Sequence, residues 1–257
     1  MVASGMASRI LAVVPARFAS TRFPGKIIAP LFGKPLVLYA YQRALQASLV
    51  DEAVIATDDD HVVQALAPYG VPVIMTRTDH ASGTDRIAEV AANTSAEIIV
   101  NIQGDEPLID PGTIDAAIRP LLDAPDVVMA TARHRIREFE CISDPNVVKV
   151  VCDTQGHALY FSRSPIPFIR DTADREASAN VYWQHIGLYV YRRSFLPRFA
   201  GMPQTPLEKL EKLEQLRVLE NGYTIAVVDT EYEGTGVDVP EDLEKVQAIM
   251  ASLKEEV

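Results

Sequence analysis

The sequence has 257 residues, of which 48% are hydrophobic and 23% charged, and its formal net charge is −11. This length and composition fit one α/β domain, or one domain with a subdomain, and exclude a disordered chain. The negative charge argues against nucleic-acid binding and against binding to an anionic membrane, since both need a basic surface.

The cysteine count and the N-terminal segment restrict the compartment. Cys141 and Cys152 have no metal-type spacing and are too few for a disulfide framework, so we expect a reduced, cytoplasmic protein. No apolar stretch reaches the roughly 18 residues of a membrane span, and residues 1–8 lack the basic region of a signal peptide. We therefore expect no membrane insertion, a leader at 1–8 and one domain at 9–257.

Apolar, β-rich runs alternate with helical patterns in the first half of the chain. The predicted strands are Ile10–Val14, Ala53–Thr57, Val71–Met75, Ile98–Ile102 and Val127–Ala132. The predicted helices between them are Leu36–Ala47, His61–Tyr69, Thr84–Asn93 and Pro111–Leu122. Near-continuous apolar strands separated by amphipathic helices are typical of βαβ units on a parallel sheet that is covered on both faces.

The pattern changes after the fifth strand. We expect, in order, a hairpin of Val147–Val151 and Ala158–Phe161, a loop at Ser162–Ser178, a strand at His185–Arg193, one leucine-rich helix at Pro206–Glu220, a strand at Ile225–Thr230 and a closing helix at Pro240–Leu253. The predicted fold is α/β, with a mixed, mostly parallel central sheet, flanking helices and an inserted β-rich lobe at about 133–205.

A loop with three cations follows the first strand. Arg17, Arg22 and Lys26 lie in Pro15–Lys26 with the small Ser20 between them, and the pattern is not that of a Walker A loop. Small residues let backbone N–H groups approach an anion, and Arg offers a bidentate fork. Because open α/β sheets bind ligands at the carboxyl ends of their strands, this loop is a candidate anion site. The alternative is a charged surface loop.

Two carboxylates and a helix start complete the candidate chemistry. Asp105 in VNIQGDEPLI and Asp238 in GTGVDVPEDL each follow an apolar strand beside glycine. Mg²⁺ favours one or two protein carboxylates plus phosphate oxygens, while the alternatives are a turn at Asp105 and a helix cap at Asp238. Ser82 in HASGTDR either caps a helix or offers donors to a ligand. Together these loops indicate phosphoryl or nucleotidyl transfer.

Seven motifs resemble, in order, those of the 3-deoxy-manno-octulosonate (Kdo) cytidylyltransferases. They are PARFASTRFPGK, MTRTDHASGTDR, VNIQGDEP, ALYFSRSPIP, HIGLYVYRR, LEKLEQLRVLENG and GTGVDVPEDLEKV, and they span about residues 9–250. The resemblance implies a nucleotide-diphospho-sugar-transferase-like fold, a homodimer formed through the inserted lobe, CTP and Kdo as substrates, Mg²⁺ as cofactor and a role in lipopolysaccharide synthesis. Open alternatives are a synthetase for CMP-sialic acid or 8-amino-Kdo, and a catalytically silent nucleotide-binding module.

The resemblance also implies roles for single residues. The triphosphate would be bound by Arg17, Ser20, Arg22 and Lys26, and the cytosine by Arg77, Ser82 and Gln103. Asp105 and Asp238 would bind Mg²⁺ and, with Arg22 and Lys26, form the catalytic group. The sugar would be bound by Arg163, His185, Tyr189, Glu214 and Gln215. The residue types of the sugar group fit core packing or a solvated helix face equally well, and the variable loop 170–182 leaves the sugar acid open.

Overall fold

The structure is a computed structural model that describes residues 9–20, 22–80, 82–170 and 181–252. The leader at 1–8, positions 171–178 of the predicted loop, positions 171–180 of the variable loop and position 253 of the predicted closing helix lie outside the described residues.

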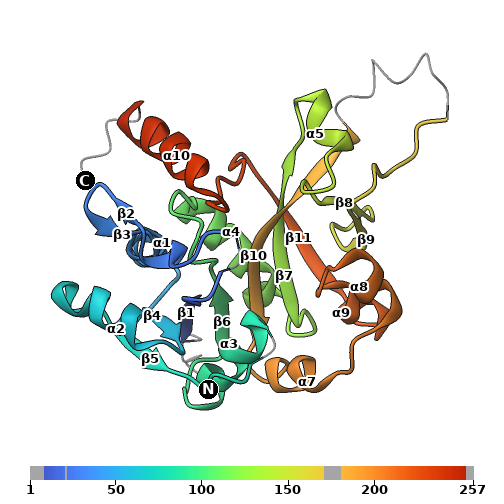
Figure 1. Ribbon diagram of the computed structural model, residues 1–257. Coiled ribbons are helices and arrows are strands. Elements are labelled where there is room, and N and C mark those ends of the chain that lie inside the picture. The colour runs from blue at the N-terminus through green and yellow to red at the C-terminus, as the bar shows by residue number, and fades with distance from the viewer. Residues whose placement is uncertain (1–8, 21, 81, 171–180, 253–257) are drawn as a thin grey trace.

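A mixed sheet forms the centre of the molecule (Figure 1). Its strands are β1 (Ile10–Pro15), β4 (Glu52–Thr57), β5 (Val73–Met75), β6 (Ile98–Asn101), β7 (Met129–Arg135), β10 (Trp183–Arg192) and β11 (Ile225–Thr230). They are ordered β11-β7-β10-β6-β1-β4-β5. Only β10 runs antiparallel to its neighbours within this path, and the other pairs are parallel. The predicted mixed, mostly parallel sheet is therefore confirmed.

Helices cover both faces of the sheet. The helices are α1 (Leu36–Gln46), α2 (Asp60–Leu66), α3 (Gly83–Ala92), α4 (Pro111–Asp123), α5 (Phe139–Ser143), α7 (Leu196–Gly201), α8 (Pro206–Glu211), α9 (Leu216–Glu220) and α10 (Pro240–Ser252). One buried cluster joins α1 and α4 to the sheet, and a second joins α3 and α7 to its other face. In β1, Val14 belongs to the first cluster and Val13 to the second, which explains why this strand is apolar at every position.

The predicted leucine-rich helix at 206–220 is wrong as a single element. Lys212 has φ 56° and ψ 45°, a left-handed conformation that ends α8, and α9 starts four residues later. Leu213, within this break, and Leu216, at the start of α9, are buried. Leucine periodicity predicted the burial of Leu213 and Leu216 but not the exposure of Leu210, and it does not reveal that the chain bends.

Short elements in the connections escaped prediction. They are the 3₁₀ turn η1 (Lys26–Ile28), the small ribbon of β2 (Pro30–Leu31) and β3 (Lys34–Pro35), and the helices α5 and α7, while the predicted helix His61–Tyr69 ends in a second 3₁₀ turn, η2 (Ala67–Tyr69). None of them is long enough to repeat an apolar period, which is the signal that sequence analysis relies on.

The expected hairpin is present and continues the central sheet. β8 (Lys149–Cys152) pairs with β9 (Ala158–Ser162) and with β10. The ten residues of β10 run from this hairpin into the central sheet, where a bulge interrupts the pairing with β7 between Ile186 and Tyr189. The β-rich segment is thus joined to the central sheet by a continuous strand (Figure 1).

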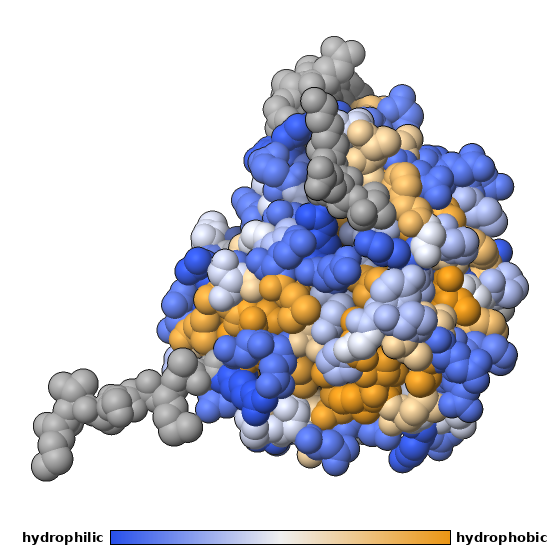
Figure 2. Space-filling view, turned by 90° about the vertical axis from the view of Figure 1, so that its left-hand side faces the viewer, coloured by the Kyte–Doolittle hydropathy of each residue, from blue (hydrophilic) through white to orange (hydrophobic). Residues whose placement is uncertain are grey.

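Apolar side chains also reach the surface. The side of the molecule that carries α2, β5 and α10 shows hydrophobic patches separated by hydrophilic areas (Figure 2). Ile74 and Met75 of the edge strand β5 are 37% and 50% exposed, and the shortness of this strand limits pairing with another chain. Among the described residues, no helix has the length and apolar character needed to cross a membrane.

Candidate active site

A cleft of about 380 Å³ opens where β1 and β6 end. The residues that line it are Pro15, Arg17, Ala19, Ser20, Arg22, Lys26, Ile27, Gly83, Gln103, Gly104, Asp105 and Asp238. The structure therefore brings together the cationic loop and both predicted carboxylates. Their convergence follows from the sheet, because β1 and β6 are parallel and their carboxyl ends share one edge.

Lys26 lies at the centre of the charges in this cleft. Its Nζ is 2.6 Å from Asp105 Oδ2 and 3.0 Å from Asp238 Oδ1, and Arg22 Nη2 is 3.1 Å from Asp238 Oδ2. Burial alone would lower the pKa of Lys26, but the two carboxylates outweigh it and the pKa is raised. Near pH 7 the cleft thus holds a charged ammonium group between two carboxylates.

A glycine allows the two strand ends to approach each other. A Cβ atom at Gly104 would lie 2.8 Å from the backbone oxygen of Pro15, closer than side chains tolerate. The loop that carries Asp238 is fixed separately, because the N–H of Val237 donates to the backbone oxygen of Asp105 at 2.9 Å. The backbone itself therefore sets the distance between Asp105 and Asp238.

Glu106 is a functional candidate that sequence analysis missed. Its Oε2 accepts hydrogen bonds from the Tyr232 hydroxyl at 2.5 Å and from the Thr235 N–H at 3.1 Å. Burial raises the pKa of Glu106 to about 7. This carboxyl ties the Asp238 loop to the Asp105 loop. Its position next to Asp105 was the available signal, but Glu beside Gly and Pro fits a turn equally well.

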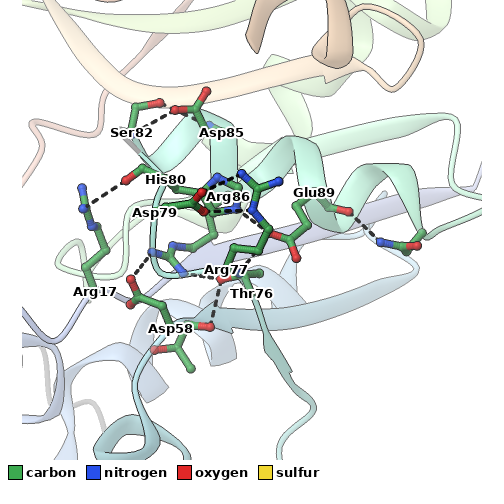
Figure 3. A network of polar contacts seen from close by, with 12 residues as sticks. Arg17, Asp58, Thr76, Arg77, Asp79, His80, Ser82, Asp85, Arg86 and Glu89 are labelled. Atoms are coloured by element: carbon green, nitrogen blue, oxygen red, sulfur yellow. Dashed lines mark hydrogen bonds and ion pairs between the residues drawn. The ribbon is translucent and has the colours of Figure 1, made fainter. Parts of the chain in front are cut away.

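The start of α3 borders the cleft. Ser82 Oγ accepts from the Asp85 N–H at 3.2 Å, and Asp85 Oδ2 accepts from the Ser82 N–H at 3.0 Å, which together form a capping box. The expected capping use of Ser82 is confirmed. Arg17 reaches the same segment through its Nη2, which donates to the His80 backbone oxygen at 3.4 Å (Figure 3).

A buried arginine anchors this segment to the sheet. Arg86 is fully buried, donates to Asp58 Oδ2 at 2.7 Å and contacts the Thr76 hydroxyl (Figure 3). Asp58 follows β4 and Thr76 follows β5, so Arg86 joins the ends of two strands to α3. Sequence analysis missed it because a charged residue in a helical pattern indicates solvent exposure.

Arg77 does not line the cleft. Its Nε and Nη2 lie 2.9 and 3.1 Å from the two carboxylate oxygens of Asp79, on an exposed part of the surface (Figure 3). Arg77 was expected beside the nucleobase, but its guanidinium group pairs with Asp79 and does not line this cleft.

Four residues expected to bind the sugar form a second group. The Tyr189 hydroxyl donates to Gln215 Oε1 at 3.3 Å, and Glu214 accepts from the Thr84 hydroxyl. The His185 ring lies 5.4 Å from the Tyr189 ring. Burial lowers the pKa of His185 to about 3 and raises the pKa of Glu214. His185 is thus neutral near pH 7.

Gln215 offers a donor from a buried position. The residue is 3% exposed, and its Nε2 has no hydrogen-bond partner in the part of the chain that the structure describes. A buried donor without a partner costs free energy, so a ligand that accepts a hydrogen bond from this amide would be bound more tightly.

A second hollow of about 570 Å³ lies beyond the start of α3. It is lined by Ser82, Asp85, Ala200, Met202, Gln204, Glu208, Lys209, Lys212, Glu214 and Arg217. Ser82 lines this hollow and its neighbour Gly83 lines the first cleft, so the first turn of α3 separates the two spaces.

Arg163 is held by backbone oxygens. Its Nε donates to the Glu211 oxygen at 2.7 Å and its Nη1 to the Pro145 oxygen at 2.8 Å. The Glu211 carboxylate also accepts from the Arg163 N–H at 2.9 Å. The side chain therefore fixes α8 to the end of β9, and two of its guanidinium nitrogens already have partners.

Comparisons with known proteins agree on one kind of enzyme. A family model described as cytidylyltransferase matches residues 11–225. A 3-deoxy-manno-octulosonate cytidylyltransferase of Solibacter usitatus is 56% identical over 95% of this chain and 95% of its own. One of Geobacter sulfurreducens is 57% identical over 92% and 97%. A solved structure of CMP:2-keto-3-deoxy-manno-octonic acid synthetase complexed with CTP superimposes with a TM-score of 0.89 at 42% identity, over 96% of this chain and all of that one.

Proposed function

Since this chain belongs to the 3-deoxy-manno-octulosonate cytidylyltransferase family, we propose that it transfers the CMP group of CTP to Kdo and releases pyrophosphate. The observation that carries the proposal is the convergence of Arg22, Lys26, Asp105 and Asp238 in one cleft. A catalytically silent module would have no need of all four charges. A sialic acid as substrate is not favoured, because the relatives described above are named for Kdo.

The nucleotide side of the cleft suits a triphosphate. Arg17, Ser20, Arg22 and Lys26 line one wall, and charge-assisted hydrogen bonds from Arg and Lys are the strong ones. We assign the cytosine to Gln103 and Ser82, which lie next to the first turn of α3. Arg77 joins them only when its ion pair with Asp79 opens.

The sugar side supplies neutral and charged partners for hydroxyl groups. We assign His185, Tyr189, Glu214 and Gln215 to the sugar, supported by the buried unpartnered amide of Gln215. Arg163 is assigned to the sugar carboxylate. It would bind with the part of its guanidinium group that Glu211 and Pro145 do not use.

The transfer step depends on position and charge. The C2 hydroxyl oxygen of the sugar forms a bond to the α-phosphorus, and the bond from that phosphorus to the bridging oxygen of pyrophosphate breaks. The proton of the hydroxyl leaves to solvent, and no base from the protein is invoked. Arg22 and Lys26 stabilise the charge on the departing pyrophosphate, because fixed cations need no rearrangement as that charge develops.

Asp105 and Asp238 fit a magnesium ion as cofactor. Both carboxylates already converge on one cation, the Lys26 ammonium group, and both offer the hard oxygen atoms that Mg²⁺ prefers. Among the described residues there is no group of three or more His, Cys, Asp or Glu side chains that could hold a metal. Phosphate oxygens would therefore complete the ligand set. When bound, the ion would lower the pKa of the attacking hydroxyl and offset phosphate charge.

Single and double variants of the two aspartates test the metal assignment. We expect Asp105→Asn and Asp238→Asn each to abolish most activity, and the double variant to be little worse, because each change dismantles the same site. Mn²⁺ electron paramagnetic resonance in the presence of CTP gives a readout apart from turnover, and each variant should lose the bound signal. Fully multiplicative losses of activity would mean that the two residues do not share an ion.

Pyrophosphate release tests the activity itself. The purified chain is supplied with CTP, Mg²⁺ and one sugar acid at a time: Kdo, 8-amino-Kdo or N-acetylneuraminate. We expect release with Kdo, and chelation of Mg²⁺ should stop it. Release only with N-acetylneuraminate, or with none of the three, would contradict the proposal.

We further propose a cytoplasmic homodimer. Both cysteines are free in the structure, which fits a reducing compartment. Phe139 and Phe168 are 67% and 80% exposed beside α5, and apolar side chains of this size commonly mark a protein–protein contact.

A further inference from the structure

A buried threonine lies against the bulge of β10. Thr131 of β7 is fully buried, and its Oγ1 is 2.7 Å from the Leu188 backbone oxygen and 3.1 Å from that of Ile186. The same Oγ1 is 2.9 Å from Nε2 of His185. One hydroxyl group therefore serves three partners at the point where the pairing of β7 and β10 is interrupted.

The number of hydrogen atoms decides the direction of each bond. A threonine hydroxyl has one hydrogen, and a backbone carbonyl oxygen can only accept. If that hydrogen pointed at His185, the hydroxyl oxygen would face two carbonyl oxygens with no proton between them. The hydroxyl hydrogen must therefore go to the carbonyls, and the bond to His185 must be donated by Nε2–H to Oγ1.

The ring carries no second hydrogen. Burial lowers the pKa of His185 to about 3, so the imidazole is neutral near pH 7 and its other nitrogen, Nδ1, is an acceptor. Within the described part of the chain, the hydrogen bond of the ring is the one at Nε2, and none is made at Nδ1. The Phe161 and Tyr189 rings, with centroids at 4.9 and 5.4 Å, fix the orientation of the imidazole.

We propose that Thr131 is a positioning residue for sugar recognition, which holds His185 as its Nε2–H tautomer so that Nδ1 accepts a hydrogen bond from a sugar hydroxyl. The proposal rests on the proposed function and on the assignment of His185 to the sugar. An acceptor nitrogen excludes a carboxylate at this point, because two acceptors share no proton. Thr131, which touches no substrate, thereby selects a hydroxyl group at the subsite of His185.

Nitrogen-15 NMR of the free protein tests the tautomer without reference to activity. Two-bond ¹H–¹⁵N correlation spectra distinguish a protonated from an unprotonated ring nitrogen. We expect Nε2 of His185 to be protonated at pH 7, and Nδ1 to be unprotonated and to shift when Kdo is added with CTP. A protonated Nδ1, or a doubly protonated ring, would overturn the proposal.

Two variants separate positioning from simple stability. Thr131→Val removes the hydroxyl and keeps the side-chain shape, whereas Thr131→Ser keeps the hydroxyl. We expect Val to populate the Nδ1–H tautomer and to raise the KM for Kdo about 3- to 10-fold, the effect of one neutral hydrogen bond, with the KM for CTP within twofold of the parent. Ser should restore both the tautomer and the KM.

The outcomes separate this proposal from the proposed function. An unchanged KM for Kdo in a folded Val variant would overturn the role of Thr131, as would a Ser variant that fails to restore the tautomer. If Val fails to fold, the tautomer of the parent and of Ser still decides the assignment. If the parent has no cytidylyltransferase activity, the proposed function fails, while the spectra still report whether Thr131 sets the tautomer.

Discussion

Lys26 combines a buried stem with a charged end that meets two acidic residues. The residue is 8% exposed, yet its Nζ faces a solvent-accessible cleft. A lysine in this setting can exchange one anion for another without losing charge, because its pKa is raised. In the proposed reaction it moves from carboxylate oxygens to phosphate oxygens.

We expect Lys26→Ala to lower turnover about 10- to 150-fold. A charge-assisted hydrogen bond contributes about 1.5–3 kcal/mol, and each 1.4 kcal/mol is a factor of about ten in rate. Steady-state pyrophosphate release at saturating CTP and Kdo measures the effect. Lys34→Ala is the matched control, since Lys34 lies in β3 and does not line the cleft. Turnover within twofold of the parent would remove Lys26 from the phosphate-binding loop.

The neutral His185 makes a second prediction, about stability in acid. Its pKa falls from 6.5 in the unfolded chain to about 3 in the folded one, because burial disfavours the charged ring. Between these values the unfolded state binds more protons, so this residue lowers the free energy of unfolding as the pH falls. From pH 7 to pH 5 the loss is about 2 kcal/mol, at about 1.4 kcal/mol per pH unit.

Urea denaturation of the parent and of His185→Gln at both pH values measures this loss. Other groups titrate equally in the two proteins, so we expect the parent to lose about 2 kcal/mol more than the variant between pH 7 and pH 5. Equal losses in the two proteins would mean that His185 is already protonated in the fold.

Sequence analysis identified the residues of the cleft better than the residues that position them. Arg22, Lys26, Asp105 and Asp238 are charged side chains in loops after strands, a combination that points to a ligand. Thr131 lies in an apolar strand, and its importance depends on a bulge in β10 that lies more than 50 residues further along the chain. A pairing partner so remote in sequence leaves no local pattern to recognise.

At the scale of elements, the break between α8 and α9 directs Glu214 and Gln215 toward the proposed sugar site. Glu214 and Gln215 lie between the left-handed Lys212 and the first turn of α9. In a continuous helix, adjacent residues are rotated by about 100° around the axis, so Glu214 and Gln215 would point in different directions. The missed boundary therefore lies at the proposed sugar site.

We expect a β-branched residue at the break to be destabilising. Left-handed backbone costs an L-residue about 1–2 kcal/mol, and branching at Cβ adds to the crowding. Lys212→Val should therefore lower the free energy of unfolding by at least about 1 kcal/mol, whereas Lys209→Val, within the helical α8, should cost about 0.5 kcal/mol. Equal costs in chemical denaturation would show that Lys212 is not left-handed in solution.

At the scale of the whole molecule, the long strand β10 joins the hairpin to the central sheet. Periodicity predicted the strands of the central sheet, because each of them is buried on both faces or pairs with an apolar neighbour. It did not predict the strand order, in which β10 enters between β6 and β7. That order depends on contacts between distant segments and on no local propensity.

The proposed dimer makes a prediction at this scale. Phe139 and Phe168 line an apolar hollow of about 290 Å³ with Ile142, Pro165, Ile169 and Tyr182. We expect the parent to have the mass of two chains in size-exclusion chromatography with light scattering, and Phe139→Glu combined with Phe168→Glu to have the mass of one. Leu210→Glu is the control, because Leu210 is 80% exposed on α8 and outside this hollow. A parent with the mass of one chain, or a double variant that keeps the mass of two, would contradict the proposed interface.

The Lys26 ammonium group between Asp105 and Asp238 competes with cations from solution for the two carboxylates. Any divalent ion that enters from solution must displace Lys26, which is tethered to the same cleft at a high effective concentration. The competition ends only when another anion accepts the ammonium group, and the triphosphate of a nucleotide is such an anion. Under the proposed metal assignment, metal and nucleotide would therefore load together, and the concentration of free magnesium alone would not set the occupancy of the site.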